Sequence, residues 1–195
     1  MHLAYSYDGL NWMPLNGGQS YLIPSVGKDK LMRDPSICQA PDGTFHMVWT
    51  SSWTDRIIGH ASSRDLIHWS EQQAIPVMMH EPTAHNCWAP KLFYDEPSQT
   101  YYIFWATTIP GRHKEIPTSE SEKGLNHRIY YVTTKDFCTF SKTKMFFNPD
   151  FSVIDAAIVK DPKLGDLIMI VKNENSNPPE KNLRVTRTKK IEKGF

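Results

Sequence analysis

Two aspartates stand at the same place in a repeated segment of this sequence. Asp34 opens the segment DPSI (34–37) and Asp155 opens DAAI (155–158), and a turn and an apolar stretch follow each of them. A third copy of the segment, APKL (89–92), has alanine at the corresponding place. A carboxylate can activate water or attack directly, and repulsion between neighbouring carboxyl groups tunes their pKa values. The pattern therefore indicates acid–base chemistry of the kind that cleaves a glycosidic bond.

Asp34 taken alone also has a simpler explanation as a turn residue. The proline that follows it favours an extended backbone at Asp34, and a second Asp-Pro pair occurs at 161–162. Because Asp155 matches Asp34 in register, we favour a functional role for both aspartates.

The elements that must position these aspartates are strands. Short stretches rich in β-branched and aromatic residues alternate with turn signals such as Asp42-Gly43 and Glu96-Pro97-Ser98. No stretch keeps a helical period, so we expect an all-β chain. The predicted strands cover residues 45–49, 56–62, 100–107, 127–134, 166–173 and 182–188.

A second repeat follows later in each unit. The segments SYD (6–8), SRD (63–65) and TKD (134–136) each precede an aromatic residue that lies four positions after the aspartate. The aspartate can close a turn through its own backbone, and the aromatic ring would then pack between neighbouring sheets. We therefore interpret these segments as structural elements of the repeat rather than as catalytic residues. The aromatic residues are Trp12, Trp69 and Phe140.

The repeat has the size of a propeller blade. The corresponding first positions are separated by 55 and then 66 residues, which suits a four-stranded blade with long loops. We expect one partial domain with blades over 34–77, 89–147 and 155–195, the last with an incomplete outer strand. Residues 1–30 would hold the outer strands of a further, incomplete blade.

Three blades and a fraction cannot close a ring. We therefore expect the chain to be truncated at both ends and to self-associate through exposed blade edges. In a propeller the first strand of each blade runs along the central axis. Asp34, Ala89 and Asp155 should then face one funnel from successive blades.

The overall composition excludes several other classes of protein. A net charge of +1 gives no field that would favour nucleic acid or an anionic membrane. No apolar run approaches the roughly 18 residues of a membrane span, and the first residues do not form a secretory signal. Three widely spaced cysteines suggest ordinary thiols rather than a zinc site or a disulfide framework.

Five segments, in this order and spacing, resemble glycoside hydrolase family 43, the five-bladed β-propeller glycosidases. Together they span nearly the whole chain, so the resemblance implies a five-bladed propeller of which this chain supplies about three blades and part of another. The segments are LMRDPSI (31–37), ASSRDLIHW (61–69), NCWAPKLFYD (86–95), YYIFWATT (101–108) and VIDAAIV (153–159).

The resemblance implies an inverting hydrolase of β-xylosides or α-L-arabinofuranosides in plant polysaccharides. Asp34 would be the general base, and Asp155 would tune and orient the general acid. That acid would be a glutamate at the start of the fourth blade, beyond Phe195, because Glu174 and Glu192 are poorly placed for the role. We therefore expect the 195 residues alone to be inactive, and the whole protein to be secreted or periplasmic.

Four neighbouring side chains are expected to bind the sugar: Arg33, Trp53, His85 and Trp88. A surface ion pair for Arg33 and core packing for Trp88 remain open as alternatives. His80, His85 and Cys87 do not complete a metal site. No cofactor is expected; relatives with a central calcium exist, but no residues here specify its ligands.

Three alternatives to this hydrolase remain open. The triplet Arg33-Asp34-Pro35 also occurs in related fructan-cleaving propellers. A propeller could bind carbohydrate without hydrolysing it, or could serve only protein interaction, since a fold does not fix a function. Paired aspartates in the funnel favour a carbohydrate partner over the last of these.

Overall fold

The computed structural model describes residues 1–114, 124–175 and 179–195. Regular structure in these residues consists of strands and two short 3-10 turns, η1 (Leu15–Gly18) and η2 (Ile191–Lys193). The all-β prediction is therefore confirmed. The strands are β1 (Ala4–Tyr5), β2 (Met13–Pro14), β3 (Arg33–Gln39), β4 (Phe45–Thr50), β5 (Ile58–Ser63), β6 (Gln73–Ile75), β7 (Trp88–Asp95), β8 (Thr100–Thr108), β9 (His127–Thr134), β10 (Lys144–Phe147), β11 (Val153–Lys160), β12 (Leu167–Asn173) and β13 (Leu183–Thr188).

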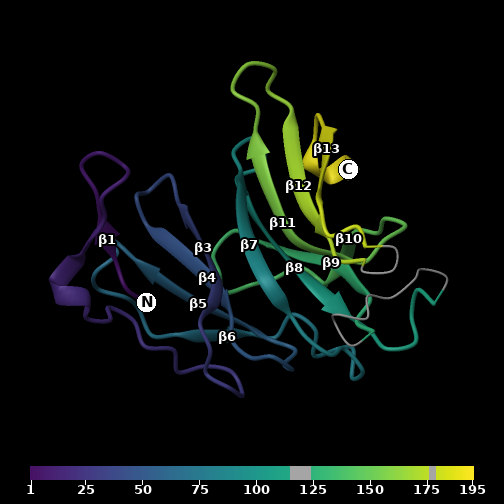
Figure 1. The fold of residues 1–195 in the computed structure, drawn as a ribbon, viewed down its shortest axis with the longest axis horizontal. Coiled ribbons are helices and arrows are strands. Elements are labelled where there is room, and N and C mark those ends of the chain that lie inside the picture. Colours follow the sequence, from purple (N-terminus) through teal and green to yellow (C-terminus); the bar gives the residue numbers. More distant parts are fainter. Residues whose placement is uncertain (115–123, 176–178) are drawn as a thin grey trace.

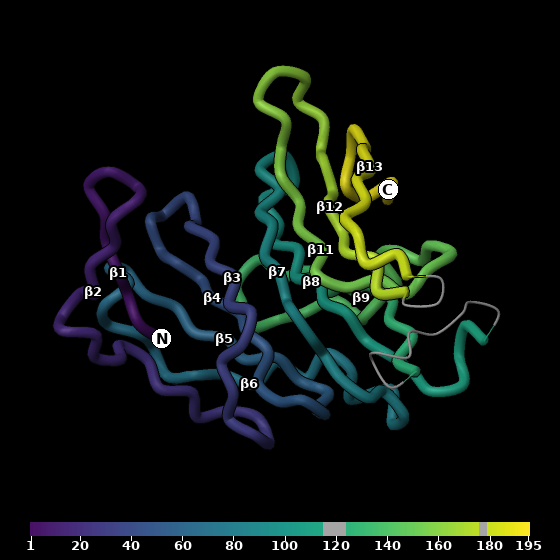
Figure 2. The backbone as a smooth tube through the Cα atoms, in the orientation of Figure 1, coloured from purple at the N-terminus to yellow at the C-terminus, as the bar shows by residue number. Residues whose placement is uncertain are grey.

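Three antiparallel sheets follow one another along the chain, each a simple meander. Their strand orders are β3-β4-β5-β6, β7-β8-β9-β10 and β11-β12-β13. The first strands β3, β7 and β11 are neighbours, while the later strands of each sheet lie farther out (Figure 1). The tube in Figure 2 passes through the three sheets in sequence order. The sheets form an open arc, which confirms a partial propeller.

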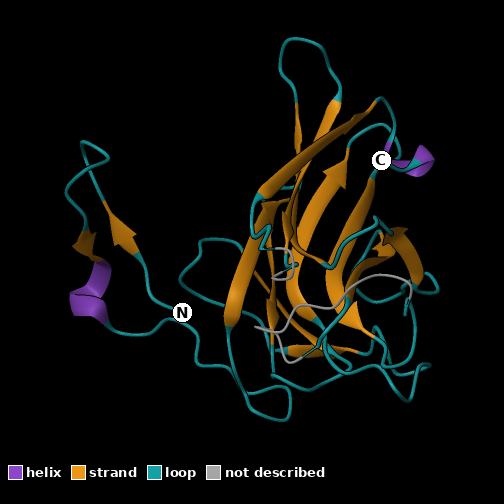
Figure 3. Ribbon diagram, turned by 45° about the vertical axis from the view of Figure 1, so that its right-hand side comes forward, coloured by secondary structure: helices purple, strands orange, loops and turns teal. Residues whose placement is uncertain are grey.

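The pair β1–β2 stands to one side of the three sheets (Figure 3). Trp12, beside this pair, is 63% exposed, whereas Trp69 and Phe140 are partly buried against hydrophobic clusters. The predicted packing of the aromatic residue is therefore wrong for Trp12. The physical reason is that no neighbouring sheet lies against β1–β2 to cover the ring.

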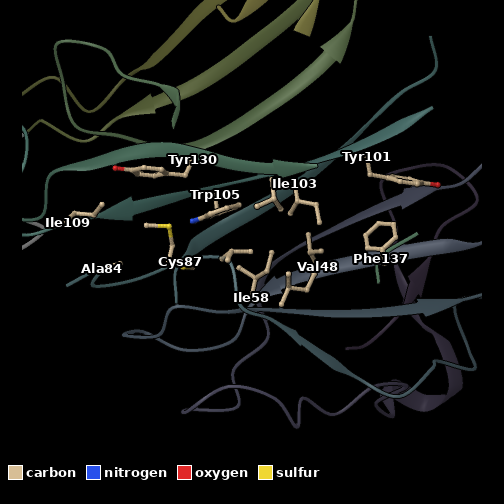
Figure 4. Packing of buried hydrophobic residues seen from close by; sticks show 14 of the residues in the cluster. Val48, Ile58, Ala84, Cys87, Tyr101, Ile103, Trp105, Ile109, Tyr130 and Phe137 are labelled. Carbon is tan, nitrogen blue, oxygen red and sulfur yellow. The ribbon is translucent and has the colours of Figure 1, made fainter. Parts of the chain in front are cut away.

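Apolar side chains fill the space between adjacent sheets. Val48 and Ile58 of the first sheet pack against Ile103 and Trp105 of the second (Figure 4). A second cluster joins the second sheet to the third through residues such as Met169. Strand β8, covered on both faces, is buried from its second residue to its last.

Close packing also explains one glycine inside a strand. A Cβ atom at Gly59 of β5 would lie 2.1 Å from the Trp49 ring, so glycine is needed there.

The outermost strand β13 exposes apolar side chains: Leu183 and Val185 are 69% and 63% exposed. No helix among the described residues has the length and apolar character to cross a membrane.

The turns predicted at the aspartates of the second repeat are present. The Oδ1 atom of Asp65 accepts the backbone N–H groups of Ile67 and His68 at 2.8 and 2.7 Å, and Asp136 repeats this pattern. The residues that follow, Leu66 and Phe137, have φ values of 64° and 54°. These aspartates thus hold the backbone in a left-handed turn, as the repeat predicts.

Candidate active site

The innermost strands β3, β7 and β11 share one irregularity near their beginnings. The pairing register shifts between Arg33 and Ser36, between Trp88 and Lys91, and between Ile154 and Ala157. Within these bulges lie the three residues of the first repeat, Asp34, Ala89 and Asp155, with φ values of 50°, 47° and 54°. The three positions are therefore structurally equivalent.

Asp34 is exposed to solvent and is held from the neighbouring strand. The buried hydroxyl of Thr50 donates a hydrogen bond to Asp34 Oδ2 at 3.4 Å. The same Thr50 oxygen accepts the backbone N–H of Ala89 at 2.9 Å. Thr50 thus ties the first aspartate to the equivalent bulge of the next sheet. Sequence reasoning missed Thr50, because its role depends on its pairing opposite Arg33.

The Asp155 side chain is exposed, as that of Asp34 is, but surrounding atoms partly desolvate its carboxyl group and raise its pKa. The nearby charges of Asp34 and Glu174 act in the same direction. Lys172 and Lys91 oppose them. The two aspartates stand in equivalent bulges near the first residues of β3 and β11, and the charge of Asp34 raises the pKa of Asp155.

Arg33, Trp53 and Trp88 form a contact group next to these carboxyl groups. The guanidinium of Arg33 lies 4.3 Å from the centre of the Trp53 ring. The Trp53 and Trp88 rings meet edge to face at 6.0 Å, and Trp88 Nε1 donates to the Trp53 carbonyl at 3.0 Å. Trp53 remains 47% exposed, so the side of its ring away from Arg33 can meet a ligand.

The loop that carries Trp53 is fixed by an aspartate that sequence reasoning did not single out. Asp29 Oδ2 accepts the Ser52 hydroxyl at 2.6 Å and the Trp53 backbone N–H at 3.0 Å. These hydrogen bonds, with that of Ser52 first, lower the pKa of Asp29. A lone aspartate in a loop gives no sequence signal for this role.

His85 joins the group through a buried histidine. Its backbone N–H donates to the Thr108 carbonyl at 2.9 Å, and Thr108 pairs with His127 across β8 and β9. His127 lies under Trp88, with ring centres 5.1 Å apart. Burial lowers the pKa of His127 to about 3, so this imidazole is neutral.

The tautomer of His127 follows from its partner. Asn86 uses its Oδ1 atom to accept the Thr108 N–H at 2.9 Å, which leaves Asn86 Nδ2 as the donor to His127 Nε2 at 3.0 Å. The ring proton of His127 is therefore on Nδ1. The hydrogen-bonded pair Asn86 and His127 thus supports the ring of Trp88.

Glu174 is fully buried at the end of β12, where its carboxylate meets two lysines. Lys172 Nζ contacts Oε1, and Lys181 Nζ lies 2.9 Å from Oε2. Burial alone would raise the pKa of Glu174, but the ammonium groups of Lys172 and Lys181 outweigh it and lower the pKa. Glu174 is therefore an ionised group and not a proton donor.

Glu192 lies away from this group. It borders a hollow with Asp95 and Lys160, the last residues of β7 and β11, whereas Asp34 and Asp155 stand near the first residues of their strands. Within residues 1–114, 124–175 and 179–195, no cluster of three or more His, Cys, Asp or Glu side chains could hold a metal ion.

Comparison with known proteins gives consistent results. A family described as "Probable glycosyl hydrolase domain", related to glycoside hydrolase family 43, matches residues 1–194. An α-L-arabinofuranosidase of Bifidobacterium longum subsp. longum is 22% identical over 172 residues, which cover 78% of this chain and 16% of that protein.

Two solved structures show the same fold. An α-L-arabinofuranosidase from Lactobacillus brevis superimposes with a TM-score of 0.58 at 15% identity, over 82% of this chain and 50% of that one. An exo-β-1,3-galactanase from Phanerochaete chrysosporium gives 0.57 at 18% identity, over 80% and 35%. The chain thus spans half or less of the length of these relatives. Since the family match covers nearly every residue, the chain belongs to the glycosyl hydrolase domains related to glycoside hydrolase family 43.

Proposed function

We propose that this chain forms the base side of the active site of a glycoside hydrolase that acts on plant polysaccharides or oligosaccharides. The observation that carries the proposal is the pair Asp34 and Asp155, which occupy equivalent bulges and interact electrostatically. A carboxyl group with a perturbed pKa beside a second carboxyl group is typical of functional sites.

The two aspartates are suited to different tasks. Asp34 is exposed and receives only a long hydrogen bond from Thr50, so it can accept a proton from an attacking water. Asp155 lies among several charges, which suits a residue that tunes and orients a neighbouring acid. In this scheme the reaction inverts the anomeric carbon.

A sugar ring would bind beside the carboxyl groups. The exposed ring of Trp53 would stack on the C–H face of the sugar, and Arg33 would donate hydrogen bonds to its hydroxyl groups. Trp88 and His85 would complete the wall of this subsite. Asp29, Asn86 and His127 hold these side chains in place without contacting the sugar.

In this scheme the proton donor is a glutamic acid that these 195 residues do not supply. Glu174 is ruled out for this role because two lysines keep it ionised. Without the donor, unactivated glycosides should not be turned over by these 195 residues.

We further propose that the sugar is xylose or arabinose, by analogy with the arabinofuranosidase relatives. Galactan is the second candidate, because a structural relative is an exo-β-1,3-galactanase. Hydrolysis of xylo-, arabino- and β-1,3-galacto-oligosaccharides by the protein that carries this chain would separate these substrates.

Substitution of Asp34 tests the proposal in the whole protein that carries this chain. There we expect Asp34→Asn to lower kcat on an unactivated oligosaccharide by roughly a hundredfold or more, with little change in binding. Asp161→Asn is the matched control, because Asp161 also precedes a proline but closes the β11–β12 turn through the Lys163 N–H. A kcat of Asp34→Asn equal to that of the unsubstituted protein would overturn the proposal. If the unsubstituted protein binds the oligosaccharide but does not hydrolyse it, the chain belongs to a carbohydrate-binding propeller instead.

A further inference from the structure

We propose that Lys172 is a positioning residue of this site: the buried carboxylate of Glu174 anchors its ammonium group beside Asp155 and thereby keeps Asp155 ionised. The inference rests on the proposed function only for its catalytic consequence. Its structural basis is the pairing of β11 with β12 and the ion pairs of Glu174.

The repeat places Lys172 next to Asp155. In the first sheet Thr50 of β4 pairs with Arg33, the residue before the aspartate, and its side chain reaches Asp34. In the third sheet Lys172 of β12 pairs with Ile154, the residue before Asp155. Lys172 is thus the counterpart of Thr50, with an ammonium group in place of a hydroxyl.

Glu174 determines where that ammonium group lies. A lysine side chain has four flexible carbons and a strong preference for water. Lys172 nevertheless directs Nζ to Oε1 of a fully buried carboxylate, while its own side chain is 36% exposed. A buried carboxylate needs paired charges, so Glu174 holds both Lys172 and Lys181.

Charged groups from every neighbouring strand act on Asp155. Asp34 on β3 and Glu174 after β12 favour its protonated form, as does its partial burial. Lys91 on β7 and Lys172 favour the ionised form, and Lys172 has the largest effect of the four charges. Without Lys172, two carboxylates and one lysine would remain around Asp155, and it would take up a proton more readily.

The consequence for the proposed reaction is direct. A protonated Asp155 would be neutral, so it would no longer disfavour the ionised form of a neighbouring acid and would not raise the pKa of that acid. Lys172 therefore preserves the charge that Asp155 needs for its proposed task, without touching the sugar itself.

The experiment is a 13C NMR titration of the Asp155 carboxyl in the intact protein, with the signal assigned through Asp155→Asn. We expect Lys172→Met to shift the midpoint of Asp155 to higher pH. Lys181→Met is the matched control, since it removes the other lysine of Glu174 but does not change Lys172, which pairs with the residue before Asp155. In this variant the midpoint of the Asp155 titration should stay near that of the wild type.

A double-variant cycle tests the anchoring. The shift caused by Lys172→Met should become smaller in a Glu174→Gln background, because Lys172 has then already lost its anchor. An equal shift in both backgrounds would show that Glu174 does not position Lys172, and no shift in either would overturn the proposal.

Two features keep the test decisive. If Lys172→Met fails to fold, the NMR signal of Lys172 Cε in the wild type is followed instead. Its chemical shift should change with the same midpoint as the Asp155 carboxyl signal, and a Lys172 signal that does not change as Asp155 titrates would overturn the proposal. The readout needs no turnover, so a failure of the proposed hydrolase would appear as an active Asp34→Asn variant while the NMR shifts persist.

Discussion

Asp34 and Asp155 adopt the same left-handed backbone conformation, with φ values of 50° and 54°, at the same bulge of two different innermost strands. Ala89 has a φ of 47° at the third bulge, although alanine has no side-chain oxygen that could favour it. The blade architecture therefore imposes this conformation, and the aspartates occupy it. Aspartate tolerates a left-handed backbone better than most residues, so the bulge can present a carboxylate at little cost.

Replacement of Ala89 by glycine tests this conclusion. A left-handed alanine costs about 1–2 kcal/mol, and glycine removes that cost while losing one methyl group worth about 0.8 kcal/mol of burial. Glycine also adds chain entropy to the unfolded state, about 0.5–1 kcal/mol, so we expect Ala89→Gly to change the free energy of unfolding by less than about 1 kcal/mol in either direction. Urea denaturation measures the change.

Ala106, the residue that pairs with Trp88 across the same sheet, is the matched control. It is fully buried and has an ordinary strand conformation. Ala106→Gly should lower the free energy of unfolding by about 1–2 kcal/mol, through the lost methyl group and the added chain entropy. Equal destabilisation by both variants would contradict an imposed left-handed conformation at Ala89.

Local patterns made much of the fold predictable. Strand β9 has the predicted bounds 127–134, and β12 and β13 begin one residue later than predicted, because apolar alternation and turn residues are local signals. The turns at Asp65 and Asp136 were predictable for the same reason, since each aspartate bonds to its own following backbone.

Pairing between strands was not predictable from the sequence. The role of Thr50 depends on its register opposite Arg33, and that of Lys172 on its register opposite Ile154. Likewise, Glu174 is an isolated glutamate in the sequence, and only the fold brings Lys172 and Lys181 to it. The candidate aspartates were accessible because they repeat, whereas their supporting residues do not.

Acid should weaken the turn at Asp136. Backbone hydrogen bonds from Thr139 and Cys138 lower the pKa of Asp136 to about 2 in the folded chain, below the roughly 3.9 of an unfolded chain. The stabilising contribution is thus present above about pH 4 and is lost as the pH falls towards 2. We expect Asp136→Asn to reduce the loss of stability in this window, measured as the urea midpoint against pH. Identical pH profiles for the two proteins would refute the prediction.

A second pH effect should come from the stacked pair His46 and His60. The two rings are 5.4 Å apart and hydrogen-bonded at 3.2 Å, and both stack on Phe137. Burial, with the nearby His46 charge, lowers the pKa of His60 to about 4, below the roughly 6.5 of the unfolded state. The unfolded chain binds the proton first, so stability should fall as the pH drops from about 6.5 to about 4 and then level off for this group.

The variant His60→Gln should show a smaller slope of stability against pH between about pH 6.5 and about pH 4, with stability measured as the urea midpoint. The slope is reduced rather than abolished, because the buried His127 titrates in the same sense. His80→Gln, at an exposed histidine, serves as the control and should keep the wild-type slope. A wild-type slope in His60→Gln would place the acid sensitivity elsewhere.

The sugar subsite can be tested by removing one exposed ring. Trp53→Ala deletes the indole but keeps the Trp53 carbonyl, which accepts the hydrogen bond of Trp88, so Trp88 should stay in place. Loss of stacking should weaken oligosaccharide binding by roughly tenfold, about 1.4 kcal/mol. Trp12→Ala is the control, because Trp12 is 63% exposed beside β1–β2, apart from the three sheets. Isothermal titration of both variants with xylo- and arabino-oligosaccharides decides the matter: equal affinity in Trp53→Ala and the wild type would exclude this ring from the binding site, because nothing else around Trp88 has been removed.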